Sequence, residues 1–186
     1  MLGINFHYGE VAESEKDELR KQLKPLAAMG VNTVRTSFHW TDYEKEKGVY
    51  NFTQNLKNYF EVCAEFGITV APVLKESLEA GAGNPLYANG NLSAKESIEG
   101  YGNFCAAFIK YIGKYAKYAL ISNEPNFCDV PVDVYTKMLK SSYKKIKAVN
   151  SKVKVVGAEV SGWGTSYITD MLESVKNMSK ESKIDL

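Results

Sequence analysis

Residues 118–127 read YALISNEPNF, and this stretch contains the pattern from which the fold is best inferred. An apolar run that looks like a strand ends abruptly in the polar segment SNEPN. A carboxylate, Glu124, therefore follows the strand directly, next to the amide of Asn123. Folds with parallel sheets place their chemistry at the carboxyl ends of the strands. The stretch thus indicates an α/β protein with a site at this strand end.

The rest of the chain repeats this alternation of short apolar runs and longer amphipathic stretches. Five such units with short connections predict a parallel sheet covered by helices. Ser93, followed three residues later by Glu96, predicts a capping box at the start of one helix. The predicted strands are 2–9, 31–40, 68–74, 118–122 and 152–160, with a sixth beginning within 182–186, and the predicted helices are 14–29, 53–66, 93–117, 132–149 and 165–180.

Charge and hydropathy narrow the possible partners. Lys and Arg total 23 against 22 Asp and Glu, a net charge of +1, which gives no electrostatic reason to expect binding to nucleic acid or an anionic membrane. The apolar runs have the length of strands, so no membrane span is predicted. No signal peptide is visible, and the location of the protein, including secretion of a parent enzyme, stays open.

Motifs for cofactors and metals are not found. No Gly-rich phosphate-binding motif follows any predicted strand, so no nucleotide cofactor is expected. The three cysteines form neither a disulfide framework nor a metal-spaced cluster, and no metal site is expected. Cys63 and Cys105 stand among apolar residues of predicted helices and are interpreted as core residues, whereas Cys128 follows the SNEPN segment and is placed near a pocket.

Polar side chains stand at nearly every predicted strand end. They are His7, Tyr8, several residues of 35–40, Lys75, Glu76, Asn123, Glu124 and Glu159. A ring of strand ends that converges on one site is the arrangement of a (β/α)₈ TIM barrel, which takes about 250 residues. The chain supplies about five βα units. We therefore expect residues 1–186 to be the N-terminal part of a single barrel domain.

Four segments resemble clan A glycoside hydrolases, in particular the cellulase-like family 5 and the xylosidase-like family 39. The segments are LGINFHYG at 2–9, AAMGVNTVR at 27–35, VRTSFHWTDYEKEKGVYNF at 34–52 and ISNEPN at 121–126. Their order and spacing are more specific than any one of them. The resemblance implies a glycosidase catalytic domain that acts on the O-glycosidic bonds of an oligo- or polysaccharide.

The resemblance also implies roles for individual residues. Glu124 is expected to be the general acid/base, Asn123 to bind the 2-hydroxyl of the sugar, and Arg35 to support the nucleophile. In the resembled clan the nucleophilic Glu ends the seventh strand, and this chain reaches only the sixth, so the activity of the chain alone is left open. Ser122 departs from the pattern, since many relatives carry a large residue there, and this puts the shape of the subsite in doubt.

Elementary chemistry is consistent with these roles. Retaining hydrolysis uses two carboxyl groups about 5–5.5 Å apart, one as nucleophile and one as acid/base. A Glu at a strand end is rigidly aimed, and burial can raise its pKa toward the working pH. His7 is a further candidate for substrate binding. Aromatic rings stack on pyranose faces, and the candidates for this contact are Trp40, Trp163, Tyr8 and Tyr87.

Each of these residues also has a purely structural interpretation. Glu124 can serve as a turn residue or a helix N-terminal charge, and Arg35 as an ion-pair partner. The two histidines, His7 and His39, and the indole of Trp163 are also compatible with packing roles. For the carboxylates Glu76 and Glu159, solvated strand ends are the favoured interpretation over a place in the site.

Two other functions stay open on the sequence alone. A non-catalytic carbohydrate-binding half-barrel would keep an aromatic cleft without a nucleophile. A barrel aldolase would use Lys75 as a Schiff base, although no device that lowers its pKa is evident. An open sheet leaves unpaired edges, so we expect self-association or a missing C-terminal half. The sugar, the linkage and the choice between endo and exo attack are not predicted.

Overall fold

The computed structural model describes residues 2–79, 81–157, 159–162 and 164–182. Its centre is a five-stranded parallel sheet in which the strands neighbour one another in chain order. This order is that of a barrel opened along one side, as predicted. The strands are β1 (Gly3–Asn5), β2 (Thr33–His39), β5 (Thr69–Lys75), β6 (Tyr118–Ile121) and β7 (Lys154–Val156).

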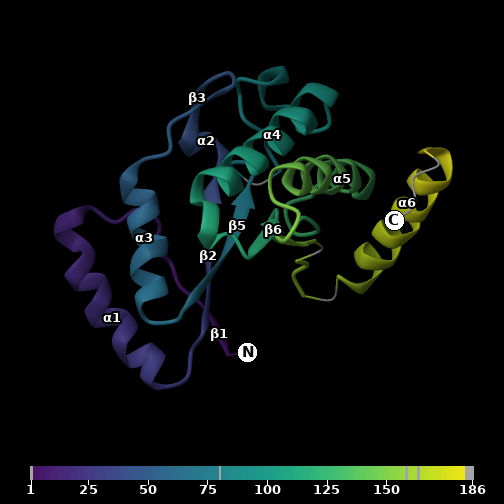
Figure 1. The fold of residues 1–186 in the computed structure, drawn as a ribbon. Helices are drawn as coiled ribbons and strands as arrows, with labels where there is room; N and C mark the ends of the chain where they lie inside the picture. Colours follow the sequence, from purple (N-terminus) through teal and green to yellow (C-terminus); the bar gives the residue numbers. More distant parts are fainter. Residues whose placement is uncertain (1, 80, 158, 163, 183–186) are drawn as a thin grey trace.

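A helix follows each strand or connects it to the next, and these helices wrap around the sheet (Figure 1). Along the chain, the first two of these helices pack against each other, and the fourth packs between the third and the fifth. The helices are α1 (Lys16–Ala28), α3 (Gln54–Glu65), α4 (Lys95–Ile112), α5 (Val132–Val149) and α6 (Thr165–Ser182). Short elements complete the chain: η1 (Glu13–Glu15), α2 (Trp40–Tyr43), the hairpin β3 (Glu44–Glu46) and β4 (Val49–Tyr50), η2 (Ala88–Gly90) and η3 (Gly113–Tyr115).

Strand β2 shows how the sheet divides its two faces. Its residues alternate strictly between buried and half-buried along the whole strand. The side chains of alternate residues point to opposite faces of a sheet. Phe38, on the buried face, is 2% exposed, and its ring centroid lies 4.9 Å from that of Phe108 on α4 and 5.8 Å from that of Phe60 on α3. This outer face therefore packs against the helices and forms the core.

The opposite, inner face carries polar and charged side chains along β2. The register pairs Arg35 with Ala71 and His39 with Lys75, so these residues share one face of the sheet. In a closed barrel this face lines the interior. Among the described residues, β1 pairs only with β2 and β7 only with β6, which leaves both as edge strands.

The predicted elements are largely confirmed, with differences at their ends: the strand predicted at 2–9 covers only Gly3–Asn5, and the helix predicted at 93–117 ends at Ile112. Helix α5 has the predicted bounds, and Cys63 and Cys105 are buried as predicted. The predicted capping box is wrong, because Ala94 is the N-cap of α4 and Glu96 binds Lys47 instead. The strand predicted at 152–160 is only three residues long. The predicted start of a sixth strand falls mainly on 183–186, outside the described residues.

Candidate functional site

The backbone after β6 makes an abrupt and closely supported turn. The Ser122 amide donates to the Leu74 carbonyl at 3.1 Å and to the Tyr101 hydroxyl oxygen at 3.2 Å. Tyr101 is fully buried on α4, and its hydroxyl donates to the same Leu74 carbonyl at 2.5 Å. Ser122 itself has a φ of 66°, in the left-handed region that non-glycine residues rarely adopt. The chain therefore leaves the sheet in a fixed direction.

Glu124 is placed by its own backbone in the same turn. Its φ is 49°, and its amide donates to the Glu159 carbonyl at 2.8 Å, which joins the turns after β6 and β7. The Glu124 carbonyl accepts from the amides of Phe127 and Cys128 at 2.9 and 3.0 Å. Unusual backbone conformations that the surroundings impose are concentrated at functional sites. The half-buried Glu124 side chain thus projects from a firmly held main chain at the carboxyl edge of the sheet.

Arg35 reaches this edge from the inner face of β2. Its Nε and Nη2 atoms donate to the two carboxylate oxygens of Glu159 at 3.0 and 2.8 Å. The pair is half-buried, with exposed side-chain fractions of 28% for Arg35 and 22% for Glu159. A two-point contact of this kind fixes the plane of the guanidinium as well as its position.

Asn123 completes this network. Its Oδ1 atom accepts a hydrogen bond of 2.5 Å from Arg35 Nη2. Because the oxygen is engaged by a cation, the amide nitrogen Nδ2 is the end that remains for a ligand. The two residues that the sequence singled out after β6 are therefore held by different groups, Asn123 by Arg35 and Glu124 by the Glu159 main chain.

A second reciprocal contact ties the same two turns together. Asn126 Nδ2 donates to the Ser161 carbonyl at 2.9 Å, and the Ser161 amide donates back to Asn126 Oδ1 at 2.9 Å. Gly81, in the loop after β5, lies against the Cys128 carbonyl. A Cβ atom at position 81 would approach that oxygen to 2.6 Å. The carboxyl edges of three strands are thus joined at one place.

The carboxylates Glu76 and Glu159 are not the solvated strand ends that were favoured from the sequence. Glu159 is bound by Arg35, as described. Glu76 is only 7% exposed, and its Oε1 atom has no hydrogen-bond partner among the residues that the structure describes. Burial raises the pKa of Glu76, and the nearby Ser122 side chain, its own backbone amide and the Lys75 ammonium oppose this only in part. Glu76 is therefore a buried acid under the SNEPN turn.

His39 lies on the inner face at the end of β2, next to Lys75 in register. Burial and the neighbouring Lys75 ammonium lower the pKa of His39, while Asp42, whose Oδ2 lies 3.5 Å from His39 Nδ1, opposes the shift. This arrangement favours a neutral imidazole, which can donate and accept one hydrogen bond each. His39 was left undecided by the sequence and is positioned at the edge that carries Glu124.

Two of the predicted aromatic platforms, Trp40 and Tyr87, are buried. Trp40 is fully buried, with its ring 4.9 Å from Tyr87 and its Nε1 bound to Glu44, so its expected role in substrate binding is not supported by its position. Tyr87 is itself 6% exposed and donates to Glu44 at 2.6 Å. Tyr8 stacks between Phe6 and Tyr59, and Trp163 lies outside the described residues.

His7 and one unpredicted aromatic residue do lie in the open. His7 is exposed just beyond β1, where the preceding Phe6 amide donates to the Arg35 carbonyl at 2.9 Å. Phe127, three residues after Glu124, is 74% exposed. In the sequence, Phe127 is an apolar residue directly after the polar turn segment SNEPN, and this short pattern does not indicate whether its ring is exposed. Phe127 is thus an open aromatic ring on the rim beside Glu124.

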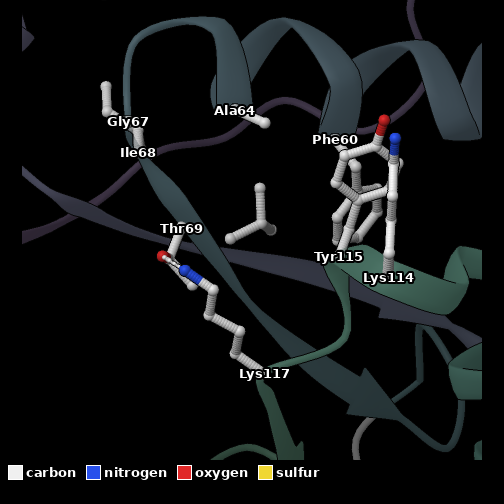
Figure 2. Close-up of a pocket in the computed structure, with 9 residues that line it drawn as sticks. Phe60, Ala64, Gly67, Ile68, Thr69, Lys114, Tyr115 and Lys117 are labelled. Atoms are coloured by element: carbon white, nitrogen blue, oxygen red, sulfur yellow. Dashed lines mark hydrogen bonds between the residues drawn. The ribbon is translucent and has the colours of Figure 1, made fainter.

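The opposite edge of the sheet has a different character. A hollow of about 250 Å³ lies at the start of β5. Figure 2 shows part of its lining, with the apolar residues Phe60, Ala64 and Ile68 and the side chains of Lys114 and Lys117. Lys117 donates to the Thr69 hydroxyl at 3.2 Å. In βα barrels this end of the sheet usually contributes to stability, whereas the carboxyl edge carries the catalytic residues.

Among the described residues, no group of three or more His, Cys, Asp or Glu side chains is arranged to hold a metal ion. Within the same residues, every helix is too short or too polar to cross a membrane.

Comparison with known proteins places the fold. No protein-family model and no curated protein matches the chain. Solved structures do: a family 39 glycoside hydrolase from Bacteroides cellulosilyticus WH2 has a TM-score of 0.76 at 21% identity, over 93% of this chain and 35% of that one. An exo-β-1,4-mannosidase from Opitutaceae bacterium strain TAV5 has a TM-score of 0.68 at 20% identity, over 86% and 31%.

A monomeric β-xylosidase from Caulobacter crescentus CB15 is similar over 93% of this chain and 39% of its own, with a TM-score of 0.61 at 16% identity. The chain thus spans about a third of the length of these structures. Identities at this level establish the architecture and not the activity. The chain has the fold of part of a (β/α) barrel, like the barrels of these glycoside hydrolases.

Proposed function

We propose that this chain is the N-terminal part of a single (β/α)₈ catalytic domain of a retaining glycoside hydrolase, with Glu124 as its general acid/base. The substrate is an oligo- or polysaccharide with an O-glycosidic bond. The observation that carries the proposal is the pair after β6: Glu124 on a strained, hydrogen-bonded backbone, beside Asn123, whose amide is oriented by Arg35.

The chemistry follows from these positions. The Glu124 carboxyl protonates the glycosidic oxygen as the bond to the anomeric carbon breaks, and its carboxylate later takes a proton from the water that releases the sugar. Asn123 Nδ2 donates to the oxygen of the neighbouring sugar hydroxyl, a bond that strengthens as the transition state gains oxocarbenium character. Phe127 offers an open ring for an apolar sugar face. No carboxylate of this chain is assigned as the nucleophile.

The role of Glu124 as an acid is tested by the leaving group. In the natural gene product, Glu124→Gln is expected to lower turnover of phenyl glycosides by about 10²- to 10⁴-fold. The kcat/KM for 2,4-dinitrophenyl glycosides, which reports the bond-breaking step alone, should fall much less, because that leaving group departs without protonation. Glu65→Gln, at the end of α3 where Glu65 binds Arg20, is the control and should match the wild type. Equal losses on both substrates would contradict the assignment.

The domain assignment is tested by the intact mass of the gene product purified from its source. Both edge strands, β1 and β7, have one partner each in the described residues, and a barrel needs further strands between them. A mass well above 20.7 kDa, the mass of these 186 residues, is expected. A mass equal to 20.7 kDa would show that the half-barrel is made as such and that closure needs another chain.

A second candidate is a carbohydrate-binding half-barrel without catalysis. It is favoured by the state of the two neighbouring carboxylates, because Glu159 is held by Arg35 and Glu76 is buried. Neither is free to attack an anomeric carbon. A monodisperse protein that binds oligosaccharides in calorimetry and turns over no aryl glycoside would support this candidate over the hydrolase.

A further inference from the structure

Glu159 contacts both residues of the proposed catalytic pair, one through its side chain and one through its main chain. Its carboxylate holds Arg35 at two points, and Arg35 in turn binds Asn123 Oδ1. Its carbonyl accepts the Glu124 amide at 2.8 Å. A single residue after β7 is therefore connected to both residues after β6.

The hydrogens of Arg35 show why the carboxylate of Glu159 matters to Asn123. A guanidinium has five N–H donors in a rigid plane. The two-point contact with Glu159, called the fork below, uses the Nε hydrogen and one Nη2 hydrogen. Asn123 Oδ1 accepts a hydrogen bond of 2.5 Å from the same Nη2 atom. The plane that Glu159 imposes thus aims the second Nη2 hydrogen at Asn123. Without the fork, the long Arg35 side chain could rotate and the amide would lose its only described side-chain partner.

The place of Glu159 is itself secured independently of Arg35. The reciprocal bonds between Asn126 and Ser161 hold the turn after β7 against the turn after β6. Removal of the Glu159 carboxylate should therefore leave the main chain, including the Glu124–Glu159 bond, in place. This separates the function of the side chain from that of the backbone.

We propose that Glu159 is a positioning residue that, through Arg35, fixes the Asn123 amide with Nδ2 directed to the substrate. This inference rests on the proposed glycosidase function for its kinetic consequences but not for the geometry. Small displacements of a substrate-orienting group cost up to about 10²-fold in rate. We expect Glu159→Ala to lower turnover of aryl glycosides by roughly 10- to 100-fold.

The kinetic test uses 2,4-dinitrophenyl glycosides and their 2-deoxy analogues with the natural gene product. In the wild type, loss of the 2-hydroxyl should lower turnover, and Glu159→Ala and Asn123→Ala should both reduce this difference. The double variant should be no worse than Asn123→Ala alone, since both changes remove one interaction. Glu159→Asp, which keeps the carboxylate, should retain part of the difference. Additive losses with unchanged discrimination would overturn the proposal.

The chain supplies a matched control for the loss of an Arg–Glu fork. Arg20 binds both oxygens of Glu65 at 2.8 Å in the same two-point geometry, but between helices α1 and α3. Glu65→Ala removes this fork far from the carboxyl edge and should leave both substrates unaffected. A loss of turnover in Glu65→Ala equal to that in Glu159→Ala would overturn the proposal by showing a general effect of fork removal.

A second readout needs no turnover. The side-chain amide of Asn123 should be ordered in ¹⁵N relaxation measurements of the wild type and should become flexible, with an order parameter below about 0.6, in Glu159→Ala. Asn126, held by Ser161, serves as the internal reference and should not change. An unchanged Asn123 amide would overturn the positioning role. If instead no aryl glycoside is turned over by the wild type, the proposed function fails while this readout still decides the role of Glu159.

Discussion

The two faces of strand β2 differ in what they contribute to the molecule. Val34, Thr36 and Phe38 point outward and are at most 2% exposed under the helices. Arg35, Ser37 and His39 alternate with them and remain half-buried on the inner face. One strand thus supplies the core with every second residue and the proposed site with the others. Neighbouring residues of β2 therefore serve stability and the proposed chemistry in turn.

The separation has a physical basis in the fold. Apolar burial is strong where helices cover the sheet. On the inner face of β2 the residues keep partial access to solvent, and ionic groups there are held by one another, as in the Arg35–Glu159 pair. Substitutions of neighbouring residues should therefore affect different properties, and the following changes test this division.

The largest effect on stability is expected from Phe38→Ala on the outer face. The change removes a ring that packs against Tyr59, Phe60 and Phe108. Large-to-small changes of this kind cost about 3–5 kcal/mol. Denaturant unfolding should show this loss in the free energy of unfolding, and the neighbouring Ser37→Ala on the inner face is the matched control. A similar loss in both variants would break the comparison.

A smaller effect is expected from Tyr101→Phe, also on the outer side. The change removes the hydroxyl that donates to Leu74 and accepts from the Ser122 amide. A single buried hydrogen bond contributes roughly 0.5–1.5 kcal/mol. Because Ser122 keeps its bond to Leu74 at 3.1 Å, the turn should persist and turnover should change little. A loss of turnover without a loss of stability would place Tyr101 in the site instead.

The inner face should show the opposite behaviour in Arg35→Met. The ion pair with Glu159 is partly exposed, and pairs of this kind contribute no more than about 1 kcal/mol after solvent screening. Turnover of aryl glycosides should nevertheless fall, because Asn123 loses its donor. Unfolding and kinetics on the same preparation check both statements. A large loss of stability with intact turnover would contradict the division between the faces.

The smallest effect concerns the pH dependence of stability through Glu76. Burial raises its pKa above the ordinary value of 4.5 in the folded protein. Above that value the folded state retains a proton that the unfolded chain releases, so stability falls as pH rises toward the folded pKa. Glu76→Gln does not titrate and should lose less stability than the wild type as the pH rises above 4.5. Parallel pH profiles of the two proteins would contradict the raised pKa.

Much of the fold could be predicted because its elements have strong periodic patterns. Helix α5 has the predicted bounds, and the parallel sheet follows from five repeats of strand and helix. Element ends depend on contacts between distant residues and were less accurate. The capping box failed because Lys47, far away in sequence, binds the Glu96 side chain. Strand β7 is short because it pairs along only three residues of β6.

The site was predicted in part. The polar strand ends identified Asn123, Glu124 and Arg35, and the structure brings the first and the third into contact. The sequence alone does not show whether an aromatic ring faces the core or the proposed site, and the ring of Trp40 is buried in the core. Alternation along β5 contained a signal for Glu76 that was not used. Leu74 faces outward and Lys75 inward, so the next residue is directed toward the helices.

The measurement that tests the central claim most directly is azide rescue of Glu124→Ala. The natural gene product carrying this change is assayed on 2,4-dinitrophenyl glycosides with and without sodium azide. If Glu124 is the acid/base, azide replaces the water that it would activate, so the rate should rise with azide and a glycosyl azide should accumulate. Wild-type turnover by Glu124→Ala, or low turnover that azide does not raise, would contradict the assignment of Glu124.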